Sequence, residues 1–348
     1  MNQTLNGIRR ILITILVAMG VGALFIVAIG ENPIDAYAAL FRGAFDGKLR
    51  LGTTLAGFTP LLLTSIAFAI AAKAGAFNVG VEGEVFLGGI TAAYIGINWT
   101  FLPKPALYVA CFVGAMVVAA AWAFIPAVLR AYYNVNEVCT TILMNTVALY
   151  ITSYLVSGPM SAGTANAQSL PVTVRLYQFM KPSSVNVGIF IAAITVIVII
   201  FMRQKSSWGY KIRTVGLNPT HADYVGIDSK KVFIGAMMLS GMLGGMAGCI
   251  EVLGVHGYFL NNFATGLGSN GMLAALIVKN NMVSTPFMAF FLAVLKSGAM
   301  GMQQSTGVPK SLVDTITAVF IIIATMETAF QFTKKRKKQT EEKKEDKA

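Results

Sequence analysis

The stretch Lys73-Ala-Gly-Ala-Phe-Asn-Val-Gly-Val-Glu-Gly-Glu-Val-Phe-Leu-Gly-Gly89 places two carboxylates, Glu82 and Glu84, inside an otherwise apolar part of the chain. A charge at the centre of a membrane costs at least about 2.5 to 3.5 kcal/mol, so acids in such a place indicate a role. Gly75 and Asn78 precede them, and irregular backbone survives at membrane depth only where it is buried in protein or lines a polar cavity. The stretch therefore predicts a broken or re-entrant membrane helix.

The composition of the whole chain requires a membrane. Of its 348 residues, 55% are hydrophobic and only 12% are charged, and the mean hydropathy is +0.68. An average soluble domain is about one quarter charged, so this chain cannot coat a globule of its size with polar groups. Soluble enzymes, nucleic-acid-binding domains and single-anchor receptors are excluded. The formal net charge of +12 indicates loops that face anionic membrane lipid rather than a nucleic acid partner.

Apolar runs recur along the chain, and a membrane span needs about 20 apolar residues. The runs lie near 11–30, 51–72, 76–97, 105–129, 137–158, 186–203, 232–253, 268–278, 284–303 and 311–333. We therefore predict an all-α, polytopic membrane protein with about ten transmembrane helices in one domain over residues 1–333. The mixed charges of residues 334–348 predict a disordered cytoplasmic tail. The run 268–278 is too short to cross unaided, and Gly268, Asn270 and Gly271 lie at its start, so it is a second candidate for a broken or re-entrant segment.

Basic clusters predict the orientation of the chain. Arg9 and Arg10 precede the first run, Arg130 follows the fourth, and further basic residues lie at 203–231 and 334–338. With ten spans all four clusters face one side, which the positive-inside rule makes the cytoplasm, so both termini are expected there.

Two connections are long enough to have structure of their own. Residues 31–50 have the spacing of an amphipathic interfacial helix on the outer surface, with an apolar face of Ile34, Tyr37, Ala38 and Phe41. Residues 159–185 are rich in turn-forming residues and predict an outer loop.

Two patterns look like nucleotide sites but lack the required context. Gly266-Leu-Gly-Ser-Asn-Gly271 fits G-x-G-x-x-G, yet it has no preceding strand and no acid about 20 positions later. Gly47-Lys48 is followed by Leu49, where a phosphate loop has Ser or Thr. If ATP drives this protein, another chain hydrolyses it. No catalytic residue, cofactor or metal site is predicted, since the cysteines lie in apolar stretches without paired spacing: Cys111, Cys139 and Cys249.

A polar connection after Arg213 carries the signals of a short helix. Asn218 suits the N-cap, Pro219 the first helical position and Gly226 the end. These signals predict a cytoplasmic helix of about two turns, which is marginal in water without a packing partner. His221 is better explained as part of a docking surface than as a metal ligand, because His256, the other histidine, is expected on the far side.

Glycines at four-residue spacing mark the run 232–253. Gly241-x-x-x-Gly245 and Gly244-x-x-x-Gly248 let another helix approach closely. We expect packing within the chain rather than dimerisation.

The opening stretch resembles the A-G-x-x-N-[IV]-G-x-E-G-Q signature of permeases from bacterial ATP-driven (ABC) importers of the ribose, branched-chain amino acid and nucleoside type. It departs from that signature at Glu84, where the family has Gln. The resemblance to the nucleoside and simple-sugar branch continues over the rest of the chain, from about residue 8 to 333. Its further matches are Asn32–Phe45, Asn136–Asn145, Arg213–Ile227 and Met302–Pro309.

This resemblance implies the permease subunit of an ATP-driven importer in a bacterial inner membrane, with nucleosides as the favoured substrate and simple sugars as the alternative. It implies three protein partners: a cytoplasmic ATPase, a second homologous permease and an external substrate-binding protein. It also implies that the loop helix is the coupling helix, which docks in a cleft of the ATPase. The residues assigned to coupling are Asn218, Pro219, His221, Ala222, Asp223 and Gly226.

Two other classes of function are weighed against the importer. An ion-coupled secondary carrier would need paired intramembrane acids and an inverted repeat, whereas the acids here cluster in one segment and no internal repeat is evident. A purely structural scaffold is disfavoured by the cost of the same acids.

The translocation pathway is predicted to include Asn78, Glu82, Glu84, Asn145 and Asn270. For Glu82 two interpretations stay open. Its carboxylate faces the pathway, or it accepts hydrogen bonds from free amides at the N-terminus of a half-helix and recognises nothing. Glu84 is expected to face a polar cavity or a partner subunit.

Overall fold

The computed structural model describes residues 19–28, 30–306, 311, 314, 315 and 318. Regular structure in these residues is helical, and β-type pairing among them amounts to three isolated bridges. Six of the described helices are long and apolar enough to cross a membrane, or seven spans if the bent pair Met19–Ala28 and Pro33–Phe45 counts as one. The predicted class, an all-α polytopic membrane protein, is confirmed.

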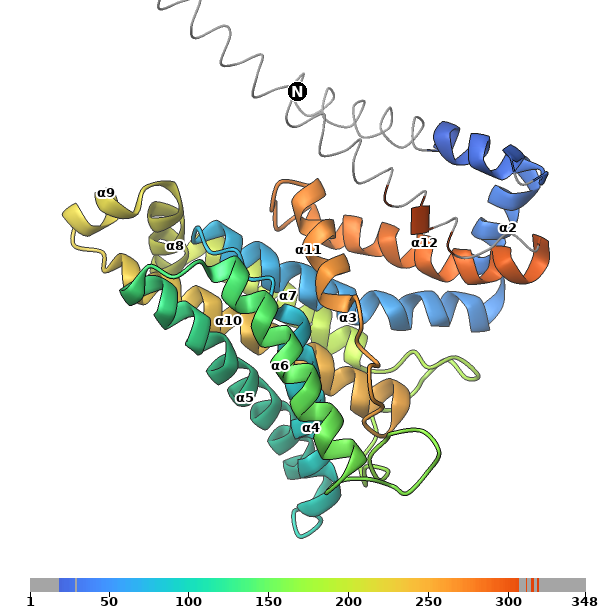
Figure 1. Ribbon diagram of the computed structural model, residues 1–348, viewed down its shortest axis with the longest axis horizontal. Helices are drawn as coiled ribbons and strands as arrows, with labels where there is room; N and C mark the ends of the chain where they lie inside the picture. The colour runs from blue at the N-terminus through green and yellow to red at the C-terminus, as the bar shows by residue number, and fades with distance from the viewer. Residues whose placement is uncertain (1–18, 29, 307–310, 312–313, 316–317, 319–348) are drawn as a thin grey trace, which may run out of the picture. The chain divides into compact units, whose positions relative to one another are not determined.

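The helices follow the chain in the colour order of Figure 1. After the helical segment Met19–Ala28 they are α2 (Pro33–Phe45), α3 (Gly47–Lys73), α4 (Val81–Asn98), α5 (Lys104–Tyr133), α6 (Glu137–Ser157), α7 (Gly188–Lys205), α8 (Ser207–Leu217), α9 (Pro219–Tyr224), α10 (Ser229–Ile250), the π-helix η1 (Glu251–His256), α11 (Leu267–Ile277) and α12 (Thr285–Thr306).

Each of the six long helices coincides with one predicted run. These helices are α3, α5, α6, α7, α10 with its η1 extension, and α12. The two runs singled out as irregular are shorter: α4 begins only at Val81, and the 11 residues of α11 measure about 16 Å against a hydrocarbon core of about 30 Å. The predicted runs 11–30 and 311–333 and the tail 334–348 lie wholly or mostly outside the described residues.

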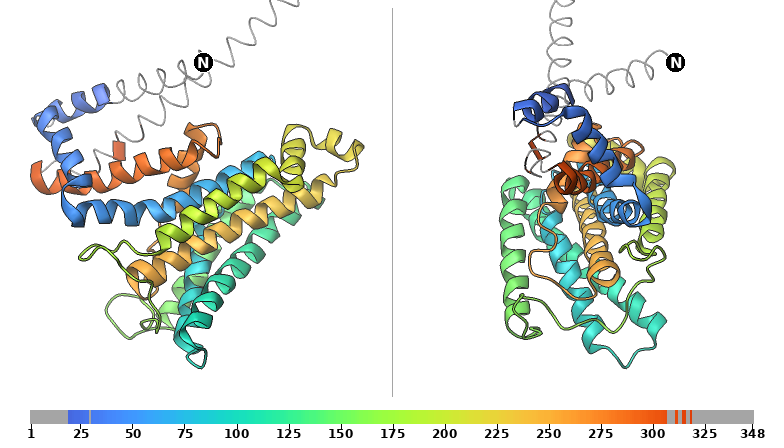
Figure 2. Two further views of the ribbon diagram at one scale, coloured as in Figure 1. Left: turned by 180° about the vertical axis from the view of Figure 1, so that it is seen from behind. Right: turned by 90° about the vertical axis from the view of Figure 1, so that its right-hand side faces the viewer.

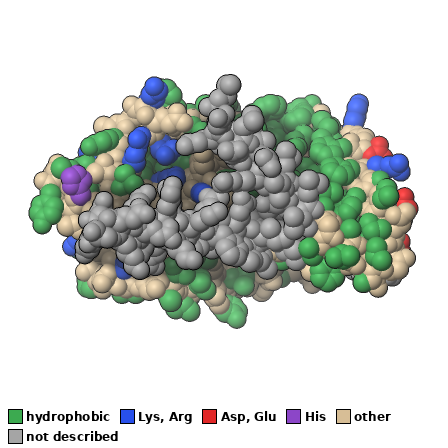
Figure 3. All heavy atoms as spheres, turned by 90° about the horizontal axis from the view of Figure 1, so that it is seen from above, with side chains coloured by type: hydrophobic (Ala, Val, Ile, Leu, Met, Phe, Trp, Pro, Cys, Tyr) green, Lys and Arg blue, Asp and Glu red, His purple; other side chains and the backbone are tan. Residues whose placement is uncertain are grey.

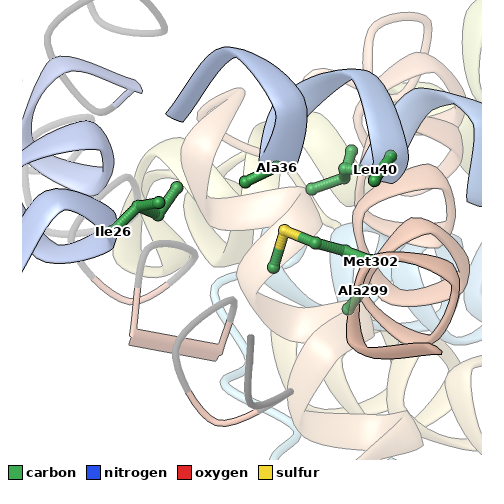
Figure 4. Close-up of a cluster of buried hydrophobic side chains, with 6 residues drawn as sticks. Ile26, Ala36, Leu40, Ala299 and Met302 are labelled. Carbon is green, nitrogen blue, oxygen red and sulfur yellow. The ribbon is translucent and has the colours of Figure 1, made fainter. Parts of the chain in front are cut away.

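The chain divides into two compact units, a terminal unit of Met1–Phe45 with Leu295–Ala348 and a central unit of Asp46–Val294. In the terminal unit, a small apolar core joins the N-terminal helices to the end of α12 (Figure 4). Gly43 and Gly301 allow the two backbones to meet, because a Cβ added to Gly43 would lie 2.7 Å from the Gly301 Cα. The buried residues of this core are Ile26, Ala36, Ala39, Leu40, Ala299 and Met302.

The amphipathic helix predicted within 31–50 is present as α2, but it turns a different face to the protein. Its buried residues are mostly small, such as Ala36, Ala39 and Gly43, because α12 packs closely there. The expected apolar residues Ile34 and Phe41 are 77% and 52% exposed. Large apolar side chains on the outside of the helix suit contact with lipid at an interface. Its place on the outer surface stays a prediction.

Helix α10 is the packing centre of the central unit, and Figures 1 and 2 show it alongside α5. Its glycines serve two neighbours. Gly241 and Gly245 pack on alanine carbonyls of α5, whereas Gly244 and Gly248 pack on α4. Close approach of helix backbones at small residues supplies much of the packing energy inside a membrane. The prediction that these glycines serve packing within the chain is confirmed.

One end of the central unit carries its basic clusters. The Lys230 ammonium lies over the Tyr132 ring at 4.8 Å from the centroid, which brings the cluster at 203–231 next to the end of α5 and its Arg130. Gly216 of α8 packs directly on the carbonyl of Lys73, so α3 ends here as well. Two of the four predicted basic clusters, Arg130 and the residues within 203–231, therefore share one end of this unit, and the other two lie outside the described residues.

The predicted outer loop 159–185 lies at the opposite end, over η1. The Arg175 guanidinium donates hydrogen bonds to the carbonyls of Val255 at 3.3 Å and His256 at 3.0 Å, and the Gln178 amide donates to the Gly254 carbonyl at 2.8 Å. These bonds satisfy carbonyls at a helix end, which would otherwise lack partners.

We expect the two ends of the central unit to face opposite sides of the membrane. Cysteine introduced at the exposed Ser161 should react with a membrane-impermeant thiol reagent added to intact cells, whereas cysteine at the exposed Thr220 should react only after the membrane is opened. The background carries Cys139→Ser, because Cys139 is exposed while Cys111 and Cys249 are buried. Labelling of both positions in intact cells would contradict this topology.

Candidate functional site

Residues 74–80 interrupt the helical structure between α3 and α4, and we call this segment the break. Its contacts are organised around Asn78. Helix α3 ends at Lys73, Gly75 adopts φ +80°, and α4 starts six residues later. The Asn78 side chain is 1% exposed. Its oxygen accepts a hydrogen bond from the Gly80 amide at 2.9 Å, and its NH₂ donates to Glu84 Oε1 at 2.8 Å and to Ser240 Oγ at 2.9 Å. One side chain therefore binds the break to α4 and to α10.

Glu84 is buried within the central unit. It is 1% exposed, and its second oxygen, Oε2, has no hydrogen-bond partner among the described residues. A Cβ added to Gly244 of α10 would lie 2.9 Å from the Glu84 Cβ and 3.0 Å from Oε2, so α10 closes directly over this side chain. Glu84 was expected to face a polar cavity or a partner subunit; in this structure the carboxyl group instead points into the packing between α4 and α10.

Asn145 of α6 holds the break from the other side. Its NH₂ donates to the Val79 carbonyl at 2.9 Å, and its oxygen accepts from the Gly83 amide at 2.8 Å. Gly83 belongs to the first turn of α4, where amides have no partner within the helix. Asn145 thus satisfies one carbonyl of the break and one free amide of the helix that follows it.

Glu82 lies where the N-termini of α4 and α11 meet. A Cβ added to Gly268 would lie 2.6 Å from the Glu82 nitrogen, and Ser269 Oγ donates to Glu82 Oε2 at 3.3 Å. The half-buried carboxylate is thus close to the positive ends of two helix dipoles, which favour a negative charge. Asn270 follows Ser269 in α11 and is half-buried too. The five predicted pathway residues are therefore gathered around one break in the chain; their role in a pathway stays a prediction.

Sequence reasoning missed Ser240 and Ser269, which bind Asn78 and Glu82 from distant parts of the chain. Each is a hydroxyl next to glycine in an apolar helix, at Ser240-Gly241 and Gly268-Ser269. That pairing was the available signal, since glycine permits close approach and the hydroxyl can then reach a partner.

The loop helix predicted after Asn218 is present as α9. The Asn218 side chain accepts a hydrogen bond from the His221 amide at 3.0 Å, Pro219 starts the helix, and Gly226 adopts φ +80°. The N-cap and the first helical position are confirmed. The helix has 6 residues, which is somewhat shorter than the two turns expected, because Val225 already caps it.

Two residues assigned to coupling are engaged within the chain, one by burial and the other, although exposed, by hydrogen bonds. Ala222 is fully buried, so it cannot present a side chain to another protein in this arrangement. The Asp223 carboxylate accepts hydrogen bonds from the Ser229 amide and hydroxyl, both at 2.9 Å, which ties α9 to the start of α10. At Asp228, the N-cap residue of α10, hydrogen bonds from the amide and ammonium of Lys231 lower the pKa of the carboxyl group.

Large apolar side chains are exposed at both ends of α9, and we call them together the apolar surface of α9. Leu217, the last residue of α8, is 81% exposed, Tyr224, the last residue of α9, is 86% exposed, and the C-cap residue Val225 is exposed as well. His221 is exposed among them. Figure 3 shows Lys and Arg side chains, together with a histidine, gathered at the left-hand end, where α9 lies. Exposed apolar side chains within a basic surface are typical of a protein docking site.

Helix α8 connects α9 to the break. Gly209 of α8 packs on the carbonyl of Arg203 at the end of α7, and Gly216, seven residues later on the same helix face, packs on the carbonyl of Lys73. Lys73 is the residue directly before the break. A displacement of α9 would therefore reach the break through two backbone contacts.

Comparison with known proteins finds permease components of transport systems. Residues 50–325 match the protein family described as branched-chain amino acid transport system permease component. The chain is 33% identical to the guanosine ABC transporter permease protein NupP of Bacillus subtilis, over 92% of this chain and 94% of that protein. It is 32% identical to the glucose ABC transporter permease protein TsgB13 of Haloferax volcanii (89% and 85%) and 30% identical to the nucleoside ABC transporter permease protein NupB of Lactococcus lactis subsp. cremoris (92% and 91%).

Asn145→Ala tests whether α6 holds the break. The substitution leaves the Val79 carbonyl and the Gly83 amide without their partner, and a buried unsatisfied group costs about 1 to 3 kcal/mol. We expect a loss of about 2 to 4 kcal/mol in the free energy of unfolding, measured by thermal unfolding of the purified permease in detergent. Thr146→Ala, at the exposed neighbouring residue, is the control, and equal melting temperatures for the two variants would contradict the assignment.

Proposed function

Because the chain belongs to the family of branched-chain amino acid transport system permease components, we propose that it is the membrane-spanning subunit of an ATP-driven importer of nucleosides. The observation that carries the substrate is the similarity to the guanosine and nucleoside permeases, at 33% and 30% identity over 92% of this chain in both cases. The glucose permease at 32% identity supports simple sugars as the second candidate. Membership of this family disfavours an ion-coupled carrier working alone.

The permease works with three partners in this proposal. A cytoplasmic ATPase hydrolyses ATP, a second homologous permease completes the membrane domain, and an external binding protein delivers the substrate. The exposed apolar surface of α9 supports the first of these, because Leu217 and Tyr224 have no cover within the described chain. The permease itself has no catalytic role.

Movement would pass from the ATPase to the substrate path through the break. Closure of the ATPase displaces α9, and α8 transmits the displacement to Lys73 through the Gly216 contact. The break then changes its geometry, and with it the positions of Asn78, Glu82 and Asn145. Rigid elements that shift against each other around a fixed site are a common basis for alternating access.

In this proposal Glu82 and Asn270 face the substrate path, whereas Glu84, Asn78 and Asn145 hold the break in shape. Two facts support the division. Glu82 and Asn270 are half-buried at the junction of α4 and α11, while Glu84 and Asn78 are each 1% exposed. Both polar atoms of the Asn145 side chain are hydrogen-bonded to backbone groups, one in the break and one in α4.

Substrate class is tested by uptake in cells that carry or lack this permease. We expect uptake of radiolabelled guanosine to need the permease and ATP, and to be reduced by excess unlabelled nucleosides but not by glucose. The control is the same cell with an ATPase subunit that cannot hydrolyse ATP. Permease-dependent glucose uptake with unchanged guanosine uptake would replace nucleosides by sugars. Uptake that survives ATP depletion while ion gradients persist would overturn the importer.

Glu82→Gln separates the two interpretations of that carboxylate, since Gln keeps the size and an acceptor for Ser269 but removes the charge. If the carboxylate only caps α4, the loss is about 1 kcal/mol of stability or less, and uptake is unchanged. We expect the other outcome, a fall in uptake of at least about fivefold, or about 1 kcal/mol, at an unchanged amount of folded permease. Asp35→Asn, which removes an exposed first-turn carboxylate from α2, is the control.

A further inference from the structure

A second exposed apolar surface lies at the same end of the central unit as α9. It is formed by Tyr132, Tyr133 and Val135, in the last turn of α5 and the connection to α6, and we call it the α5–α6 turn. The three side chains are 55%, 72% and 38% exposed. Tyr133 is the most exposed of the three.

Contacts through the start of α10 join this turn to α9. Asp223 of α9 accepts two hydrogen bonds from Ser229, and the next residue, Lys230, places its ammonium over the Tyr132 ring at 4.8 Å from the centroid. The α5–α6 turn and the apolar surface of α9 are therefore neighbours on one face, separated only by the first residues of α10.

The backbone of the turn is held in place by two hydrogen bonds and an ion pair within the chain. Asn134 adopts φ +54°, and the amides of Asn134 and Val135 donate to the carbonyls of Arg130 and Leu129, both at 3.2 Å. Arg130 also pairs with Glu137 at 3.1 Å, which closes the turn onto α6. A preformed turn loses little conformational entropy when a partner binds.

The length of α5 places Tyr133 beyond the hydrocarbon core. The helix has 30 residues and is about 45 Å long, whereas the core is about 30 Å thick. Arg130 in its last turn requires a polar environment, and Tyr133 lies about one further turn out. An aromatic ring in that place lies at the level of the lipid headgroups or beyond them, where a cytoplasmic protein can reach it.

We propose that the ATPase subunit that docks on α9 also contacts the α5–α6 turn, so that its footprint on this permease has two parts. The inference rests on the proposed function. Aromatic side chains near the centre of an interface carry much of its binding energy, and Tyr132 and Tyr133 supply two. Lys230 and Lys231 flank the turn and are exposed, so the facing surface of the ATPase is apolar with an acidic rim.

The test is the affinity of the purified ATPase subunit of the same transporter for the full-length permease in lipid nanodiscs. Tyr133→Ala is expected to weaken binding about tenfold. Tyr177→Ala removes an equally exposed tyrosine (72%) from the loop at the opposite end and should leave binding unchanged. Tyr224→Ala, on α9, reports the docking that the proposed function requires.

These variants distinguish the inference from its premise. Weaker binding for Tyr224→Ala with wild-type binding for Tyr133→Ala would overturn the second contact and leave the proposed function intact. Wild-type binding for both would overturn docking at α9 as well.

A second measurement covers a Tyr133→Ala variant that fails to fold. Cysteine at position 133, in the Cys139→Ser background, should react with a water-soluble maleimide in nanodiscs, and the added ATPase should slow that reaction at least about fivefold. No reaction even without the ATPase would mean that the turn lies in lipid, and an unchanged rate with the ATPase would mean that it is not covered. Either result would overturn the inference.

Discussion

Backbone amides and carbonyls that are buried away from water have to be bonded inside the protein. The break between α3 and α4 meets this constraint with two asparagines. Asn78 bonds the Gly80 amide, and Asn145 bonds the Gly83 amide and the Val79 carbonyl. An amide side chain suits the task because it both donates and accepts. Without these bonds each buried backbone group left without a partner would cost about 1 to 3 kcal/mol.

The same constraint explains the packing around the break. Asn78 reaches Ser240 only because α10 approaches α4 at Gly244 and Gly248, and Glu82 reaches Ser269 only because α11 approaches at Gly268. Helices α6 and α10 therefore contact the few residues that separate α3 from α4, and α11 contacts the first turn of α4. Helix α8, which leads into α9, is attached next to the break through the contact of Gly216 with Lys73.

Local signals in the sequence predicted much of this arrangement. Long apolar runs predicted the six long helices, Asn218 and Pro219 predicted the start of α9, and glycine spacing predicted the close packing of α10. What could not be predicted depends on partners far along the chain. Which of Glu82 and Glu84 turns inward is decided by where α4 begins and by two contacts of Glu84. One is with Asn78, and the other is with Gly244 of α10, which is far along the chain. Likewise, Ala222 is buried by the tertiary fold around α9, and the sequence of the six-residue helix alone does not predict this burial.

The central claim is that side chains hold the break as firmly as a helix holds its own backbone. Hydrogen–deuterium exchange of the intact transporter in lipid measures this directly. The account predicts that the amides of Gly80 and Gly83 exchange as slowly as those in the neighbouring turns of α3 and α4, and far more slowly than those of the exposed loop around Thr164. Exchange of Gly80 and Gly83 at the rate of that loop would show that the break is open to water and would contradict the account.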